Sequence, residues 1–270
     1  MPWTKNKTTS RPGREPQKSK PAKKEMTSVS FVLLDRPEVN FKQLANDLQA
    51  DWGIELALDE SAAEEKMIVT QIDDMQVAIS LIDAPIPNGE AVENAKTNLL
   101  WEDAVPTAEK HQAHLLIAVL PGGKPLLETA NLFVKICASC LKQPTALAIN
   151  ALGSVLEPTF YIDSAKMAVE KGIFPVLNLV FFGFYTSDQK TWSGYTYGLE
   201  DLGKQEIEII NSTQPVDEIM NFMTDIASYL MDADVTLKSG ETIGFTAEQK
   251  LSITESKGVA IAGKTLKIGF

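Results

Sequence analysis

The feature that most constrains the fold is the order of apolar patterns in residues 28–121. Short apolar or alternating runs predict strands at Val29–Leu34, Met67–Ile72, Gln76–Ile82 and Ala113–Leu120. Segments with one apolar face predict helices at Phe41–Trp52 and Gly89–Trp101. The predicted order β-α-β-β-α-β is that of a ferredoxin-like sandwich, in which helices cover one face of the sheet.

Local signals support the first of these elements. Asn40 precedes the helix at Phe41–Trp52 and can cap it, and Gly53 stands where that helix would end. Asp73 and Asp74 separate two alternating runs and suit the tight turn of a hairpin. We therefore expect residues 28–121 to fold as one ferredoxin-like unit.

Residues 122–270 predict a second α+β unit with a less regular order. Expected helices are Leu126–Leu141, Pro158–Lys171 and Val216–Leu230, and expected strands are Thr145–Ala151, Val176–Tyr185 and Glu206–Ile210. Val235–Phe245 and Lys250–Thr254 predict a C-terminal hairpin region, and Leu266–Phe270 an edge strand. The predicted fold class is thus α+β, with two ferredoxin-like (βαββαβ-type) units and antiparallel-rich sheets.

Residues 1–27 differ sharply from the remainder in charge. They hold eight Lys or Arg against Glu15 and Glu25, a net charge of +6, while the whole chain carries -11. The remainder therefore carries −11 − 6 = −17. Because the first 27 residues are rich in Pro, Lys, Ser and Thr, we expect them to form a disordered basic tail. The acidic body predicts a basic partner, or a tail that folds back on it, and argues against nucleic acid. An acidic surface that serves only solubility is the alternative.

The expected compartment is the cytoplasm. The sequence has no apolar run of the roughly 18 to 20 residues that a membrane span needs, and its N-terminus lacks the apolar centre of a secretory signal. Cys137 and Cys140 fall late in a predicted helix among apolar neighbours, which favours buried structural thiols. His111 and His114 do not have the spacing of helical zinc ligands, so we expect no metal and no cofactor.

The stretch Tyr185–Ser212 combines four aromatic residues, three glycines and seven charged residues. Tyr195 and Tyr197 stand two apart and share a face if this piece is extended. Tyr and Trp are favoured at protein interfaces, and the neighbouring acids suit a basic partner. The expected partner-binding residues are Trp192, Tyr195, Tyr197, Glu200, Asp201, Glu206 and Glu208. The alternative is a structural turn with a bulge, in which the tyrosines bond to the backbone.

No catalytic motif is recognisable in the chain. It has no G-x-S-x-G, its acidic pairs lack metal-loop spacing, and PGGKP at Pro121–Pro125 lacks the P-loop pattern. We therefore expect no catalytic residues. The alternative is a hydrolase or transferase with a small-molecule site between the two units, using Tyr195, Glu200, Lys204 and His114.

Several long strings resemble one family. They are YTYGLEDLGKQEIEI (Tyr195–Ile209), LKSGETIGFTAEQKLSIT (Leu237–Thr254) and SKGV (Ser256–Val259), with VSFVLLDRPEVNFKQLANDL and DDMQVAISLIDAPIP nearer the N-terminus. These resemble the bacterial family called domain of unknown function 4261, over nearly everything after the tail. The resemblance implies no activity and carries over no catalytic residue.

Together these patterns predict a non-catalytic cytoplasmic protein-binding module. Its sharpest version is an immunity protein that neutralises a bacterial toxin with a basic surface, because an acidic and aromatic surface can steer and hold such a partner. The predicted organisation is a tail at 1–27, an N-terminal ferredoxin-like unit at 28–121 and a C-terminal α+β unit at 122–270.

Overall fold

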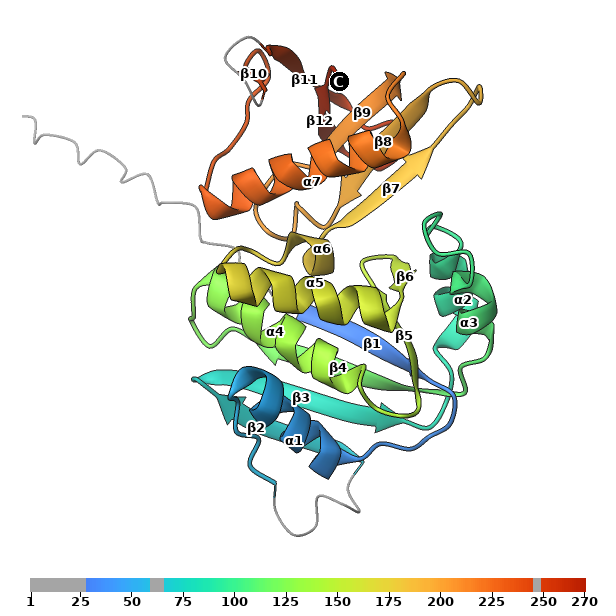
Figure 1. Ribbon diagram of the computed structural model, residues 1–270, viewed down its shortest axis with the longest axis vertical. Helices are drawn as coiled ribbons and strands as arrows, with labels where there is room; N and C mark the ends of the chain where they lie inside the picture. The colour runs from blue at the N-terminus through green and yellow to red at the C-terminus, as the bar shows by residue number, and fades with distance from the viewer. Residues whose placement is uncertain (1–27, 59–65, 245–248) are drawn as a thin grey trace, which may run out of the picture.

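The computed structural model describes residues 28–58, 66–244 and 249–270, and the predicted tail at 1–27 lies outside them. Two six-stranded sheets stand one above the other, and the described residues also form seven α-helices (Figure 1). The class is α+β with antiparallel-rich sheets, as expected.

The lower sheet has the strand order β2-β3-β4-β1-β5-β6, and every neighbouring pair is antiparallel. Its strands are β1 (Ser28–Leu34), β2 (Met67–Ile72), β3 (Met75–Ile82), β4 (Ala113–Leu120), β5 (Ala146–Ala151) and β6 (Ser154–Leu156). Helices α1 (Phe41–Trp52), α4 (Leu126–Cys140) and α5 (Pro158–Lys171) cover one face. The short helices α2 (Glu90–Ala95) and α3 (Ala104–Glu109) cover the other face beside β5 and β6.

The predicted local signals act as expected in this sheet. The Asn40 side chain accepts the N–H of Gln43, and Gly53 ends α1 in the left-handed conformation at φ 67°. Asp73 and Asp74 also have positive φ values, 49° and 65°, which the two-residue turn between β2 and β3 requires. The helix at Phe41–Trp52 and the hairpin are therefore confirmed.

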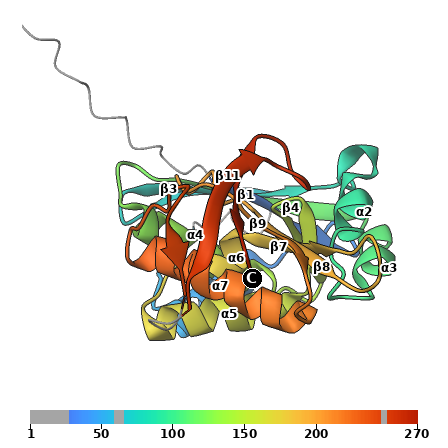
Figure 2. The same ribbon diagram turned by 90° about the horizontal axis from the view of Figure 1, so that it is seen from above.

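The upper sheet has the order β10-β11-β12-β9-β8-β7. Its strands are β7 (Phe181–Tyr185), β8 (Trp192–Tyr197), β9 (Ile207–Ser212), β10 (Thr242–Ile243), β11 (Leu251–Lys257) and β12 (Lys264–Ile268). Strands β12 and β9 are parallel, and the other pairs are antiparallel. Helix α7 (Val216–Asp232) buries Ile219, Met223 and Ile226 against this sheet. Figure 2 shows α4, α5 and α7 on the same side of the molecule.

One hydrophobic core joins the two sheets. It contains Val32 and Leu115 of the lower sheet, Tyr161 of α5, and Ile207 and Ile226 of the upper half in a single cluster of buried side chains. The short helix α6 (Val176–Leu179) leads the chain from one sheet to the other. Because the core is continuous, the two halves hold one another in place.

The ferredoxin-like units are not confirmed. Strand β4 lies between β3 and β1, and three successive antiparallel pairings make β2 run opposite to β1, so β1 and β2 are not the parallel strands of a split βαβ unit. Strands β5 and β6 lie beyond the expected boundary at residue 121 and still join the lower sheet.

Several predicted elements differ from those observed. The helix expected at Gly89–Trp101 ends at Ala95, because Thr97 bonds to Asn94 and Gly153 and Asn98 bonds to Val155. The first residues of the strand expected at Val176–Tyr185 form α6. The final strand is internal, between β11 and β9. The hairpin region expected at Val235–Phe245 and Lys250–Thr254 contains the antiparallel pair β10 and β11. Only Thr242–Ile243 of its first part is extended, and Phe245 lies outside the described residues.

Within the ranges described, no helix has the length and apolar character needed to cross a membrane.

Candidate functional site

The centre of the Tyr185–Ser212 stretch is strand β8, so the piece that holds Tyr195 and Tyr197 is extended. Gly194 faces α7, where a Cβ atom would meet Met223 and Ile219, so the glycine lets the helix approach closely. Tyr195 points to the opposite face and lies over Gly183 of β7. Its ring also contacts Phe181 and Tyr185, with centroids 6.2 and 6.5 Å apart. Tyr195 is therefore chiefly a packing residue of the sheet.

Tyr197 and Trp192 lie at opposite ends of β8. Tyr197 pairs with Phe181 on the neighbouring strand and leaves 49% of its surface exposed. Trp192 is half-buried against the core. Tyr195 and Tyr197 are on one face, as alternate residues of a strand must be. Of these three aromatics, Tyr197 is the most available to a partner.

Glu206 is buried and holds the turn that follows β8. Its carboxylate accepts the hydroxyl of Thr196 at 2.7 Å, the N–H of Gly198 at 2.7 Å and the N–H of Glu200 at 3.1 Å. Burial raises the pKa of Glu206, although these hydrogen bonds oppose the change. The side chain thus shapes the turn and is not available to a partner.

Glu208 is fully buried on the same strand. It accepts the N–H groups of Val259 and Ala260 at 3.0 and 2.7 Å, the hydroxyl of Thr265 at 2.8 Å, and the ammonium of Lys267 at 2.5 Å. Burial alone would raise the pKa of Glu208, but the hydrogen bonds from Lys267, the loop and Thr265 lower it by more. Glu208 therefore fastens the loop before β12 to the sheet and does not face solvent.

Glu200 and Asp201 are exposed in the turn after Tyr197. Lys204 of the same turn extends to Asp234, with 2.8 Å between the ammonium and the carboxylate. The structure thus places Tyr197, Glu200 and Asp201 at one end of β8, apart from Trp192 at the other.

The four residues expected for a small-molecule enzyme do not form one cluster. His114 belongs to the lower sheet, where its Nδ1 lies 2.8 Å from the carbonyl oxygen of Ala84 and burial lowers its pKa. No hydrogen bond or ion pair among the described residues joins His114, Lys204 and Tyr195. Among the residues that the structure describes, no group of three or more His, Cys, Asp or Glu side chains could hold a metal ion. Cys137 and Cys140 are buried free thiols, as expected.

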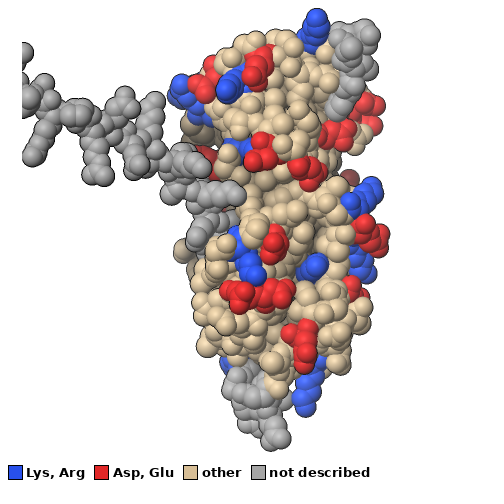
Figure 3. Space-filling view, turned by 90° about the vertical axis from the view of Figure 1, so that its left-hand side faces the viewer, with Lys and Arg blue, Asp and Glu red and all other residues tan. Residues whose placement is uncertain are grey.

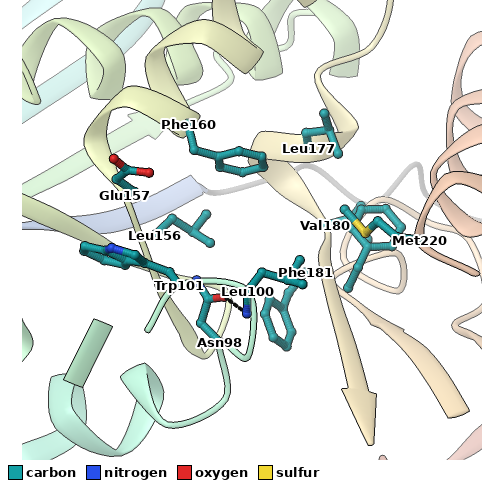
Figure 4. Close-up of a pocket in the computed structure, with 11 residues that line it drawn as sticks. Asn98, Leu100, Trp101, Leu156, Glu157, Phe160, Leu177, Val180, Phe181 and Met220 are labelled. Carbon is teal, nitrogen blue, oxygen red and sulfur yellow. Dashed lines mark hydrogen bonds between the residues drawn. The ribbon is translucent and has the colours of Figure 1, made fainter. Parts of the chain in front are cut away.

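An apolar cavity of about 120 Å³ lies between the two halves of the molecule (Figure 4). The lower half contributes Asn98, Leu100, Trp101, Leu156, Glu157 and Phe160, and the upper half Leu177, Val180, Phe181, Phe182 and Met220. Figure 4 shows Phe160 and Leu177 on one side of the cavity and Leu100 and Phe181 on the other. Leu100 and Phe160 leave 63% and 39% of their surfaces exposed at its rim.

No pattern in the sequence predicts this cavity. The helix expected at Gly89–Trp101 includes Leu99, Leu100 and Trp101. The available signal was their position after Asn98, a residue that favours turns and caps over helix interiors. In the structure the Asn98 side chain accepts the N–H of Leu100 and donates to the Val155 carbonyl, which turns both leucines outward.

Comparison with family models gives a match over the last part of the chain. The model of the family described as Domain of unknown function (DUF4261) matches residues 195–269, which run from β8 to β12. This region contains Glu206 and Glu208 with all of their hydrogen-bond partners. The earlier strings that resemble the family, Val29–Leu48 and Asp73–Pro87, lie outside the match. Searches of curated proteins and of solved structures found no match to the chain.

Proposed function

We propose that this chain, whose residues 195–269 belong to the domain of unknown function 4261 family, is a non-catalytic cytoplasmic protein-binding module. The observation that carries the proposal is the apolar surface around the cavity between the halves. Leu100 and Phe160 line the cavity and leave 63% and 39% of their surfaces exposed. Two neighbours outside the lining are also exposed: Leu99, next to Leu100 in the chain, at 58%, and Tyr197, the register partner of the lining residue Phe181, at 49%. Apolar side chains that gather around a cavity and remain in water are typical of interaction sites.

The size of the cavity indicates what a partner inserts. About 120 Å³ is close to the volume of about 150 Å³ that accommodates a benzene molecule, so one leucine or phenylalanine side chain fits. The lining residues are almost all apolar, and burial of such an anchor in a desolvated pocket supplies much of the energy of a typical interface.

The charge of the chain indicates what surrounds that anchor. Residues 28–270 carry a net −17, Glu157 lines the cavity, and Glu200 and Asp201 lie beyond Tyr197. Figure 3 shows acidic and basic side chains interspersed over one side of the molecule, so the excess charge alone does not select a face. We infer that the partner presents an apolar side chain flanked by Lys or Arg, which the acids attract and the cavity positions.

In its most specific form, the proposal has a toxin with a basic surface as the partner. The chain would then act as the immunity protein of that toxin. An acidic surface speeds association with a basic partner, and rapid capture is what neutralisation requires. The predicted outcome is protection of cells that produce the toxin together with this chain. Equal killing with and without the chain would contradict the immunity function. Protein binding as such is tested by the separate experiment that follows.

The binding test uses the full chain as bait in its native host, followed by mass spectrometry and by titration of the purified partner. Leu100→Glu places a charge at the cavity rim and is expected to abolish binding. Leu127→Glu is the matched control, because Leu127 is also an exposed leucine, at 41%, and does not line the cavity. Equal affinity of the two variants for the partner, or no partner at all, would overturn the proposed surface.

A small-molecule site is the second candidate, because the cavity lies between the two halves where the hydrolase or transferase alternative expects it. Apolar molecules that carry an amine suit its lining and Glu157. A screen by thermal unfolding tests this candidate, because a ligand that binds the native state raises Tm. Stabilisation that disappears in Leu156→Trp would favour this candidate over the protein partner.

A further inference from the structure

Among the residues that the structure describes, the two sheets have four edge strands, and three of these are short or face other segments. Strand β6 has three residues and packs against α2 and α3. Strand β7 faces the lower half across the cavity, where Phe181 and Phe182 form the lining together with Asn98, Leu100 and Trp101. Strand β10 has only two residues. Short or covered edges of this kind are how proteins avoid unwanted strand pairing.

Strand β2 is the exception among the described edges. It has six residues, MIVTQI, and lies at the outer edge of the lower sheet (Figure 1). It pairs with β3 in unbroken register, and within the described ranges its backbone bonds to no other segment. It contains no Lys, no Pro and no bulge, the usual devices that block an edge. Met67 and Val69 leave 52% and 53% of their surfaces exposed.

The sheet surface beside this edge is also uncharged. Val69 pairs with Ala78, Ala78 with Ala118, and Ala118 with Val29, so one row of small apolar residues crosses four strands. Val29, at the far end of the row, is 47% exposed. In a chain with 23% charged residues, a sheet surface of this composition is unusual for contact with water alone.

The charges at the two ends of β2 indicate its partner. Lys66 precedes the strand, and Asp73 and Asp74 follow it. Lys66 lies 3.5 Å from Asp83, and Asp74 lies 3.2 Å from Lys124. Ion pairs exposed to water in this way contribute little stability, so Lys66 and Asp74 can exchange these partners for charges on a second copy. If two copies of β2 pair in antiparallel fashion about a two-fold axis, Lys66 of each copy approaches the acidic turn of the other. A parallel arrangement would instead place Lys66 beside Lys66. Since copies of a body with net charge −17 repel one another, an uncharged strand with complementary ends is where they can meet.

We propose that the chain forms a homodimer in which β2 pairs with β2 of a second copy, making one continuous sheet of both lower sheets. The exposed backbone groups of the edge become hydrogen-bonded, and Met67 and Val69 of the two copies cover one another. This contact lies on the lower sheet, away from the cavity between the halves, and does not depend on the proposed function.

Sedimentation velocity of the full-length chain tests the proposal. The wild type is expected to be a dimer at micromolar concentrations. Val69→Lys brings two ammonium groups together at the pairing strands and is expected to weaken dimerisation about tenfold or more. Val29→Lys is the matched control, because it adds the same charge to the same row, three strands from the edge, and is expected to leave the dimer intact. Both sites are half-exposed, and circular dichroism checks that the variants fold.

Three results would overturn the proposal. One is a monomeric wild type at up to about 100 micromolar. Another is equal loss of the dimer in both variants, which would indicate that the sheets stack face to face. The third comes from hydrogen exchange. The amides of β2 should be protected in the dimer and exchange faster on dilution, and protection that does not depend on concentration would exclude edge pairing.

Discussion

The ring of Tyr195 lies directly over Gly183 of the neighbouring strand, where a Cβ atom would collide with Cζ and Cε1 of the ring. Gly183 and Tyr195 are register partners, so the small residue provides the space that the large one occupies. The ring closes that side of the upper sheet beside Phe181 and Tyr185.

Substitution Gly183→Ala should destabilise the chain by about 1 to 3 kcal/mol, because the added methyl group displaces a well-packed ring. Urea unfolding measures the change. In a Tyr195→Ala background the same substitution should cost much less, since the ring that collides is gone. Equal costs in the two backgrounds would show that the ring can move away without strain.

Substitution Glu208→Gln should destabilise the chain by about 3 kcal/mol, because it leaves the Lys267 ammonium without a charged partner beside a buried site. The loss of stability should be greatest in the loop at residues 258–263, because Glu208 accepts hydrogen bonds from N–H groups of this loop. Faster hydrogen exchange of Val259 and Ala260 would locate it there.

Acid should weaken the same interaction. The pKa of Glu208 in the folded chain lies below its ordinary value of 4.5, so its stabilising effect is complete above that value and is lost as the pH falls toward the lowered pKa. The free energy of unfolding of the wild type should therefore fall more steeply below about pH 4.5 than that of Glu208→Gln. Parallel profiles would contradict this assignment.

Glu206 should respond in the opposite direction. Burial raises its pKa above 4.5, so ionisation costs stability as the pH rises through the raised pKa. Glu206→Gln removes that cost and keeps an oxygen for the N–H groups of Gly198 and Glu200. We expect a change within about 1 kcal/mol at neutral pH. A loss as large as that of Glu208→Gln would mean that the charge itself is needed.

The two cysteines should react only after unfolding. Cys137 and Cys140 are buried in α4, and burial raises the pKa of both thiols, which keeps them protonated. A thiol reagent should therefore modify neither residue in native buffer and both in urea. Rapid modification of the native chain would show that α4 opens locally.

Local signals explain what the sequence predicted well. The cap at Asn40, the end at Gly53 and the turn at Asp73 and Asp74 each depend on one or two residues and their own backbone. Strand order depends on distant pairing, so the insertion of β4 between β3 and β1 had no local signal. The fold class was therefore predictable and the topology was not.

The candidate site was predicted less well for a related reason. Glu206 and Glu208 alternate with isoleucines, which is typical of a strand with one face in water. The turn after β8 and the loop at residues 258–263 cover that face, and both are held by the carboxylates themselves. Gly183 and Gly194 each make room for a residue distant in the chain, Tyr195 and Met223, and no local pattern predicts these contacts.

The position of β12 has a consequence for the order of events during synthesis. This strand, Lys264–Ile268, joins β11 to β9 and is the last strand of the described chain to leave the ribosome. Until β12 emerges, one edge of β9 is unpaired. The β10–β11 pair also lacks the strand that joins it to the rest of the sheet. The upper sheet is thus completed only after translation of residue 268, and a nascent chain exposes its half-built edge until then.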